Sequence, residues 1–239
     1  GNYNASQNVG LNNGLMNLIF NTPAHIPITS YKDFINNPFA EYNGYFNDYG
    51  HNPYFAIDNW RNFGKSEDLI SNIELGLKAT SWLSFTYRAA MNMSTNTGRS
   101  TTKGETPTAF GVGRGFASIP GAVGDFANRG SRLSSEAFAT VNKKFGELKF
   151  SAVAGHYFRQ TDQKNTSVSA GNLVVPELFN VSNRTGELGG GSSFSKTRLL
   201  SVYGSIGLGY KWANIEVTGR NDKTSLLAAA NRSYFYPGV

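Results

Sequence analysis

The sequence predicts an all-β fold, namely a segment of a large antiparallel β-barrel that spans a membrane. Apolar and polar residues alternate with a period of two in several stretches, as in strands whose two faces meet different surroundings. Short turns alternate along the chain with long connections, as they do in outer-membrane barrels. Charged residues make up only 16% of the 239 residues and aromatic residues 13%, whereas about a quarter of a soluble domain is charged.

The composition also excludes several classes of protein. The absence of cysteine excludes disulfides, thiolate metal sites and cysteine nucleophiles. The net charge of +6 comes from Lys and Arg spread along the chain without a basic run, so no nucleic-acid partner is predicted. No stretch approaches the roughly 18 apolar residues of a membrane helix. The chain opens on Gly1-Asn2-Tyr3, unlike a signal peptide, so we expect either a cleaved signal or an internal part of a larger protein.

The first hairpin has the clearest pattern. The odd positions from Leu69 to Ala79 are mainly apolar and the even positions mainly polar. The alternation resumes from Leu83 to Met91, with a tight connection through Ser81 and Trp82. Two such runs joined by a short turn predict a β-hairpin.

Two further hairpins and a seventh strand follow from the same pattern. Their strands and turns are predicted at 133–145, Gly146-Glu147 and 148–155, then at 197–210, Trp212-Ala213-Asn214 and 215–220, with the seventh strand starting at Ser233-Tyr234-Phe235-Tyr236. Trp82, Phe145 and Trp212 each accompany one short turn. In a barrel these rings would lie in the aromatic girdle at the periplasmic interface; a chance coincidence in an aromatic-rich chain is the alternative.

The long connections are expected to be extracellular loops. They run from Met93 to Arg132, from Gln160 to Lys196 and onward from Asn221. Residues 1–67 are rich in Asn, Tyr, Phe and Pro and show little alternation, so they are predicted to form an extracellular loop region with room for one strand. Residues 68–239 are predicted to carry the three hairpins.

Candidate substrate-binding residues lie in the first loop region. The aromatic residues there alternate with Asn and could stack on sugar rings or hold a peptide backbone; the candidates are Tyr42, Tyr45, Tyr49, Tyr54, Trp60 and Arg61. The simpler alternative, which we favour, is that these residues pack an ordered loop or contact a partner protein.

No enzyme, metal or cofactor signature is present in the sequence. His25, His51 and His156 are far apart and lack the spacing of metal ligands. The glycine-rich stretch 111–115 lacks the spacing of a dinucleotide-binding loop. Asp and Glu occur singly, so no acid–base pair, and hence no catalytic residue, can be nominated.

Several motifs resemble one family. They are Thr22-Pro23-Ala24-His25-Ile26-Pro27-Ile28-Thr29, the segment 52–62 followed by Trp82-Leu83-Ser84-Phe85, the segment 172–183, Leu200-Ser201-Val202-Tyr203-Gly204-Ser205, Val217-Thr218-Gly219-Arg220-Asn221-Asp222 and the segment 231–237. Together they resemble the SusC/RagA family of TonB-dependent outer-membrane transporters of Bacteroidetes. The resemblance covers about 15–92 and 172–239, whereas 93–170 is interpreted from alternation alone.

The resemblance implies a multi-pass barrel of about 22 strands in the bacterial outer membrane, surrounded by lipid and lipopolysaccharide. It implies import of glycans or peptides, coupled to TonB, beneath a SusD-like lipoprotein lid. The family's plug, its TonB-contacting segment and its closing C-terminal strands are not recognised in this chain, which is expected to supply about six or seven strands. The main alternative is a soluble or surface-anchored β-sandwich that binds glycans as an adhesin; a porin without TonB is a third possibility.

Overall fold

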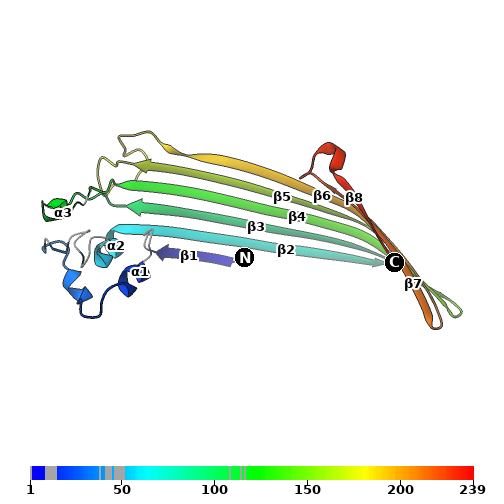
Figure 1. Ribbon diagram of the computed structural model, residues 1–239. Coiled ribbons are helices and arrows are strands. Elements are labelled where there is room, and N and C mark those ends of the chain that lie inside the picture. The colour runs from blue at the N-terminus through cyan, green and yellow to red at the C-terminus, as the bar shows by residue number, and fades with distance from the viewer. Residues whose placement is uncertain are drawn as a thin grey trace.

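The computed structural model describes residues 2–8, 15–37, 39–40, 45, 52–107, 109–113, 115 and 117–239. Within these residues, eight strands form one antiparallel sheet in the order of the sequence (Figure 1). The strands are β1 (Asn2–Asn8), β2 (Trp60–Lys78), β3 (Leu83–Thr102), β4 (Ala122–Phe145), β5 (Leu148–Gly171), β6 (Gly189–Tyr210), β7 (Ala213–Thr224) and β8 (Ser233–Gly238). The predicted all-β, antiparallel fold is confirmed.

Short helices occupy the connections. They are α1 (Leu15–Phe20), η1 (Ile28–Tyr31), α2 (Pro53–Asn59), α3 (Ala109–Gly113) and η2 (Ala229–Asn231). Figure 1 shows α1, α2 and α3 at one end of the long strands, which we call the loop end, and the short turns at the opposite end, the hairpin end. Among the described residues, no helix is long and apolar enough to cross a membrane.

The three predicted hairpins are confirmed as the pairs β2–β3, β4–β5 and β6–β7. Gly146, with φ of 62°, and Lys211, with φ of 47°, adopt the left-handed conformation that tight two-residue hairpin turns require. The third turn is Lys211-Trp212 rather than Trp212-Ala213-Asn214, because Ala213 already pairs with Tyr210. The predicted seventh strand is β8, and β1 is an eighth.

The strands are longer than the alternation predicts, and the connections at the loop end are shorter. The connections are 103–121 and 172–188 rather than Met93–Arg132 and Gln160–Lys196. β7 likewise continues past Asn221 to Thr224. Near the loop end both faces of the sheet carry Ser, Thr, Asn and Gly, so backbone pairing continues where the apolar–polar alternation has ceased.

The region predicted as loops, 1–67, differs in the same way. It contains β1, and β2 begins at Trp60, eight residues before the expected boundary at Asp68. β1 pairs with residues 62–68 of β2. The first half of β2 was not predicted, because the residues from Trp60 to Glu67 are of mixed polarity on both faces.

Little of the chain is buried, because the sheet is a single layer. The described strands form one sheet, and no second sheet covers either face of it. Two small clusters of buried residues lie at the loop end: Phe55, Ala56 and Trp60 form one, and Val123, Ala170 and Leu173 form the other. A β-sandwich buries its apolar faces between two sheets, so the sandwich alternative does not describe this arrangement.

Candidate functional site

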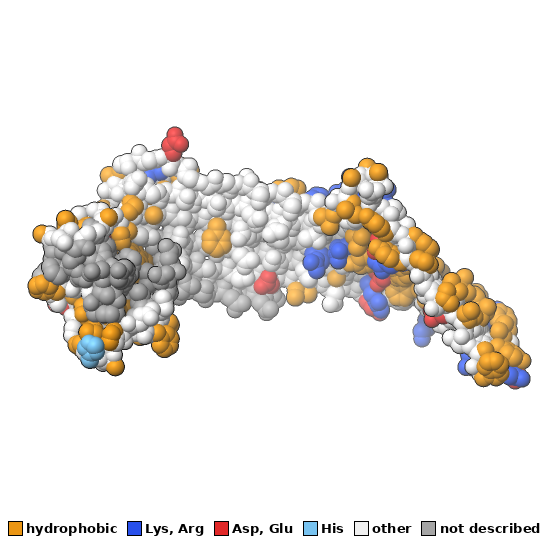
Figure 2. All heavy atoms as spheres, viewed as in Figure 1, with side chains coloured by type: hydrophobic (Ala, Val, Ile, Leu, Met, Phe, Trp, Pro, Cys, Tyr) orange, Lys and Arg blue, Asp and Glu red, His pale blue; other side chains and the backbone are white. Residues whose placement is uncertain are grey.

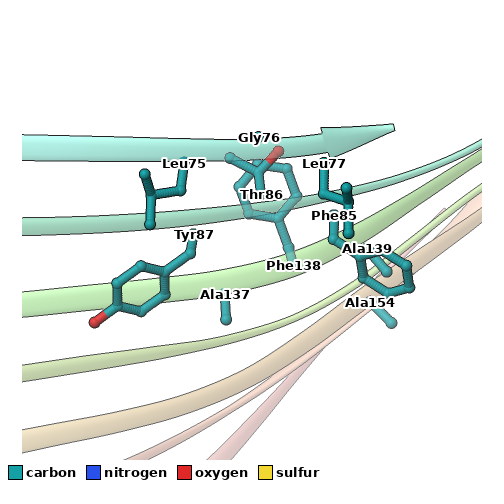
Figure 3. Close-up of a pocket in the computed structure, with 10 residues that line it drawn as sticks. All are labelled: Leu75, Gly76, Leu77, Phe85, Thr86, Tyr87, Ala137, Phe138, Ala139 and Ala154. Atoms are coloured by element: carbon teal, nitrogen blue, oxygen red, sulfur yellow. The ribbon is translucent and has the colours of Figure 1, made fainter. Parts of the chain in front are cut away.

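Strand register gives the sheet two chemically different faces. Leu75 on β2 pairs with Tyr87 on β3, which pairs with Ala137 on β4. These side chains point to one side of the sheet, while Phe138 points to the other (Figure 3). We call the first side the apolar face. Its exposed residues in the hairpin half of the strands are Leu69, Ile73, Leu75, Leu77, Phe85, Tyr87, Met91, Leu133, Ile206, Leu208, Ile215 and Val217.

The polar face carries most of the strands' hydroxyl, amide and glycine positions. In the view of Figure 2, the surface over the middle of the strands is mainly white, the colour of such side chains and of backbone. Hydrophobic side chains gather instead at the loop end and the hairpin end. One row of linked charged side chains crosses several strands of this face at the same level.

The first part of this charged row joins β2, β3 and β4. Arg88 Nε donates a hydrogen bond of 2.7 Å to Glu74 Oε2, and an Arg88 terminal nitrogen lies 3.8 Å from Glu136 Oε2. The guanidinium also lies 5.2 Å from the ring centroid of Phe138, within the range of a cation–π contact. Arg88 is therefore fixed between two carboxylates and a ring.

The second part joins β4, β6 and β7. Tyr203 donates its hydroxyl hydrogen to Glu136 Oε1 at 2.7 Å. Arg220 donates to Asp222 Oδ1 at 2.7 Å and to the fully buried Ser201 Oγ at 3.0 Å. Exposed ion pairs of this kind contribute only about 0–1 kcal/mol each. Their main effect is to hold donors and acceptors in fixed positions on the polar face.

Only part of this charged row follows from the sequence. The alternation of the first predicted hairpin puts Glu74 and Arg88 at polar positions, but each Asp and Glu occurs singly in the sequence. The pairing of Glu74 with Arg88 follows from the register of the first hairpin, which its short turn sets. Glu136 and Tyr203 could not be added, because the lengths of the connections 103–121 and 172–188 do not fix the register of the strands that they join.

Among the candidate aromatic residues that the structure describes, Tyr45 and Trp60 are buried within the loop region. Tyr42 and Tyr49 are outside the described residues. Tyr45 is only 3% exposed; its ring meets Tyr31 edge-on, with centroids 5.0 Å apart, and its hydroxyl lies 2.5 Å from Thr22 Oγ1. Its ring is therefore packed within the loop.

Trp60 is buried like Tyr45, whereas the candidates Arg61 and Tyr54 are only partly buried. Trp60 is 5% exposed and meets Phe55 edge-on, with centroids 5.9 Å apart. Arg61 is half-buried and donates a hydrogen bond of 3.1 Å to the Trp60 carbonyl. Tyr54 is also half-buried. Of the six candidates, Tyr54 and Arg61 are the described residues with surface left for a ligand.

Asn52 fixes the start of α2 and thereby the position of Tyr54. Its side-chain oxygen caps the helix by accepting a hydrogen bond of 3.0 Å from the backbone N–H of Tyr54, and Pro53 occupies the first turn, where no N–H is needed. The side-chain nitrogen donates to the carbonyls of Tyr31, at 2.8 Å, and of Ala40. This buried amide ties α2 to two earlier loop segments.

The two long loops are joined to each other at the loop end. Lys103 Nζ lies 3.0 Å from Glu105 Oε1 and 3.3 Å from Glu177 Oε1, so it bridges the connections 103–121 and 172–188. Partial burial lowers the pKa of Lys103, but the two carboxylates outweigh this effect and the pKa is raised overall. The backbone N–H of Leu173 also donates to the Gly121 carbonyl at 3.2 Å. These contacts hold the two connections together at the loop end.

The apolar face has a shallow groove of about 450 Å³ near the hairpin end (Figure 3). Leu75, Leu77, Phe85 and Tyr87 form one side of it, and the small side chains of β4 and β5, namely Ala137, Ala139 and Ala154, form its floor. The groove offers apolar contacts and no charged group. Its chemistry suits a hydrocarbon chain.

Aromatic and basic residues meet at the hairpin end, next to the apolar face. Lys143 Nζ lies 5.0 Å from the ring centroids of both Trp82 and Phe145. Lys211 is 5.4 Å from the ring of Tyr210, beside the exposed Trp212. Rings with an ammonium group beside them are typical of the boundary between an apolar layer and water.

No protein-family model and no curated protein matches the sequence. Among solved structures, the chain is similar to the RagAB peptide transporter, with a TM-score of 0.68 at 18% identity. It is also similar to the RagAB peptide importer in its "open-open" state, with a TM-score of 0.69 at 19% identity, and in its "closed-closed" state, with a TM-score of 0.69 at 18% identity. Each match covers 78% of this chain and 20% of the other. At this identity the similarity concerns the fold alone: the sheet has the fold of a segment of an outer-membrane transporter barrel, and the chain spans about a fifth of those neighbours.

Proposed function

We propose that this chain is part of a TonB-dependent outer-membrane transporter of the SusC/RagA family, and that the whole protein imports peptides or glycans. The observation that carries the proposal is the exposed apolar face on a single-layer sheet. Ile73, Leu75 and Leu77 are 55%, 59% and 63% exposed, whereas soluble proteins rarely expose contiguous apolar patches of more than a few hundred Å².

The height of the apolar face fits a membrane. On β2 it runs from Leu69 to Leu77, which is about 27 Å along the strand at ~3.4 Å per residue. With strands tilted by roughly 35–45°, this length corresponds to a height of about 19–22 Å, close to the apolar band of about 25 Å in outer-membrane barrels. The contacts of Lys143 with Trp82 and Phe145 mark the end of the band at the hairpin end, in keeping with a periplasmic aromatic girdle.

The polar face suits the wall of a wet lumen. Its charged row holds Arg88, Glu136 and Arg220 in place on strands that also carry many hydroxyl and amide groups. Charges at this level of the sheet need water or polar partners, because an unpaired charge on the lipid side is costly. The charged row therefore supports a solvent-filled or plug-filled interior.

The loop end is the proposed place of contact with cargo and with a SusD-like lipoprotein. Tyr54 and Arg61 have partly exposed side chains there, and together with Tyr42 and Tyr49 they remain our candidates for substrate contact. Contact with TonB is expected from a part of the protein N-terminal to this chain. The similar solved structures are of a peptide transporter, which makes peptides the first substrates to test.

The test uses the whole protein in its own outer membrane. The intact polypeptide is purified in detergent, its mass is measured and its ends are mapped; uptake of fluorescent peptides and oligosaccharides is then compared in cells with and without TonB. A mass near 100 kDa, as expected for about 22 strands with a plug, together with TonB-dependent uptake, supports the proposal. A native polypeptide near 26 kDa that is soluble without detergent overturns it.

A further inference from the structure

We infer that cations of β4, β5 and β6 form a binding site for the phosphate groups of a membrane lipid in the outer leaflet. Arg129 on β4 and Lys164 on β5 are directly opposite each other in the register. Arg129 lies an even number of residues from Leu133 on the same strand, so both cations are on the side of the apolar face. Directly opposite side chains have Cβ atoms about 4.5–5.5 Å apart, and like charges in that position repel each other.

Neither cation has an acidic partner among the residues that the structure describes. Arg129 and Lys164 are both exposed, and the described ion pairs on this side of the sheet join other residues, such as Arg99 with Asp125. Because the two facing cations repel each other and neither forms an ion pair with a described carboxylate, an external anion between them would be favourable. The arrangement is therefore suited to an anion that comes from outside the chain.

Two more cations extend the pair along β6. Lys196 is diagonal to Lys164 across the β5–β6 register and lies 3.4 Å from Asp162 Oδ1. Arg198 is opposite Gln160 and donates to its Oε1 at 2.9 Å. Arg129, Lys164, Lys196 and Arg198 together form what we call the cationic patch. Its four cations and the single carboxylate of Asp162 leave a net charge of +3.

The cationic patch lies directly beyond the apolar part of the same face. On β6 Leu200 directly precedes the charges on this face: Arg198 is two residues further toward the loop end, and Phe194 lies beyond it. On β4 Leu133 is the last large apolar side chain before Arg129, which is four residues further. These offsets are about 7 Å and 13 Å along the strands, or roughly 5–10 Å in height at the tilt of barrel strands. Lipid headgroups occupy that height above the hydrocarbon layer.

The chemistry of the patch favours phosphate on a lipid. The Arg guanidinium binds phosphate oxygens in a bidentate manner, and Lys adds compact positive charge. A lipid bound there would place its acyl chains against Leu133 and Leu200, whose side chains are exposed on the same face. Phe194 lies opposite Lys164 and adds an apolar surface beside the charges. A free phosphate ion would use the cations but none of these apolar neighbours.

This inference rests on the proposed function, because it requires the apolar face to meet lipid. The probe is the whole protein, delipidated in detergent and titrated with a bis-phosphorylated glycolipid, with the same glycolipid after dephosphorylation and with inorganic phosphate. The double variant Arg129→Gln/Lys164→Gln is compared with Arg132→Gln/Lys149→Gln, which removes the same charge from exposed positions of the polar face. We expect the first pair to weaken binding of the phosphorylated glycolipid about tenfold or more, and the control pair to leave it unchanged.

Two outcomes overturn the inference. One is equal binding of the phosphorylated and dephosphorylated glycolipids; the other is equal binding by the two double variants. Binding of inorganic phosphate as tight as that of the glycolipid would likewise contradict a lipid site. A difference in gel migration between unheated and heated samples in detergent shows that the barrel of each variant is assembled. A protein that assembles in the outer membrane and imports cargo but fails the titration refutes the lipid site alone, whereas a protein that never enters the membrane refutes the proposed function.

Discussion

Tyr203 on β6 donates a hydrogen bond of 2.7 Å to Glu136 on β4, across the intervening strand β5. The residue of β5 that pairs with Tyr203 is Gly155. A Cβ added there would lie 2.5 Å from the Tyr203 ring and 2.8 Å from Phe138 Cβ. The absence of a side chain at Gly155 is therefore what allows the Tyr203 side chain to cross β5 and reach Glu136.

The first prediction concerns this glycine. Gly155→Ala should destabilise the barrel by about 1–3 kcal/mol, the usual cost of an overpacked position, because Tyr203 must move and lose its bond to Glu136. Gly76→Ala is the matched control, since a Cβ at Gly76 meets nothing within 4 Å. Unfolding of the whole protein by urea in lipid bilayers measures both changes. Equal stabilities of the two variants would show that Tyr203 does not depend on Gly155.

The second prediction concerns the apolar face. Ile73→Arg, near the middle of the apolar band on β2, should cost about 2–4 kcal/mol, the cost of Arg at the bilayer midplane. Asn72→Arg is the control, because Asn72 is the preceding residue and lies on the polar face. The fraction of each variant that assembles in the outer membrane and its stability in bilayers are the readouts. If both variants assemble equally well, the apolar face does not meet lipid.

The third prediction concerns the ion pairs of Lys103, which lies in the connection between β3 and β4, outside the strands. Its pKa is raised above 10.5 by Glu105 and Glu177. A cation with a raised pKa stabilises the folded state fully below its unfolded pKa, and this contribution is lost as the pH rises through the folded value. The link between the two loops should therefore persist from neutral pH to about pH 10 and disappear above it.

Lys103→Met should remove that pH dependence. Limited proteolysis of the loops 103–121 and 172–188 is expected to be faster in this variant than in the parent at pH 8, and the two should become alike at high pH. Lys223→Met, at an exposed position of β7, should leave the cleavage pattern unchanged. Parent loops that are cleaved equally at pH 8 and at high pH would contradict the role of Lys103.

The fourth prediction concerns Asn52, whose buried amide caps α2 and bonds to the Tyr31 and Ala40 carbonyls. Asn52→Ala leaves those buried groups without partners, at a cost of about 1–3 kcal/mol. The region before β2 should then open locally, which hydrogen exchange of residues 53–59 would detect. Asn36→Ala, which removes an exposed amide bonded to the nearby Asp33, should leave that exchange unchanged.

The sequence reveals a strand only where the two faces of that strand meet different surroundings. From Leu69 to Leu77 one face is apolar and the other polar, so the side-chain pattern reveals the strand. From Ser192 to Ser195, β6 is polar on both sides apart from Phe194, and nothing in the pattern distinguishes paired backbone from a loop. Strand length near the loop end was therefore underestimated, whereas the three hairpins were predicted correctly, with the third turn displaced to Lys211-Trp212.

The candidate site was harder to predict for a related reason. Aromatic residues in a loop can stack on a ligand or pack against their own loop, and composition does not separate the two. Tyr45 and Trp60 pack inside, because Thr22, Tyr31 and Phe55 from distant segments enclose them. Glu136 and Tyr203 could not be added to the charged row, because long connections separate their strands from the first hairpin.

In the outer-membrane transporter that we propose, the length of the strands beyond the apolar band determines how far from the membrane cargo is captured. On β3 the apolar face ends at Met93 and pairing continues to Thr102, which adds about 30 Å of strand. With the apolar band in the membrane, this rigid collar lifts the mouth of the barrel well above the lipid headgroups. Cargo would then be captured at a distance from the membrane, level with the sugar chains of surface glycolipids, so those sugars would crowd the collar rather than the entrance.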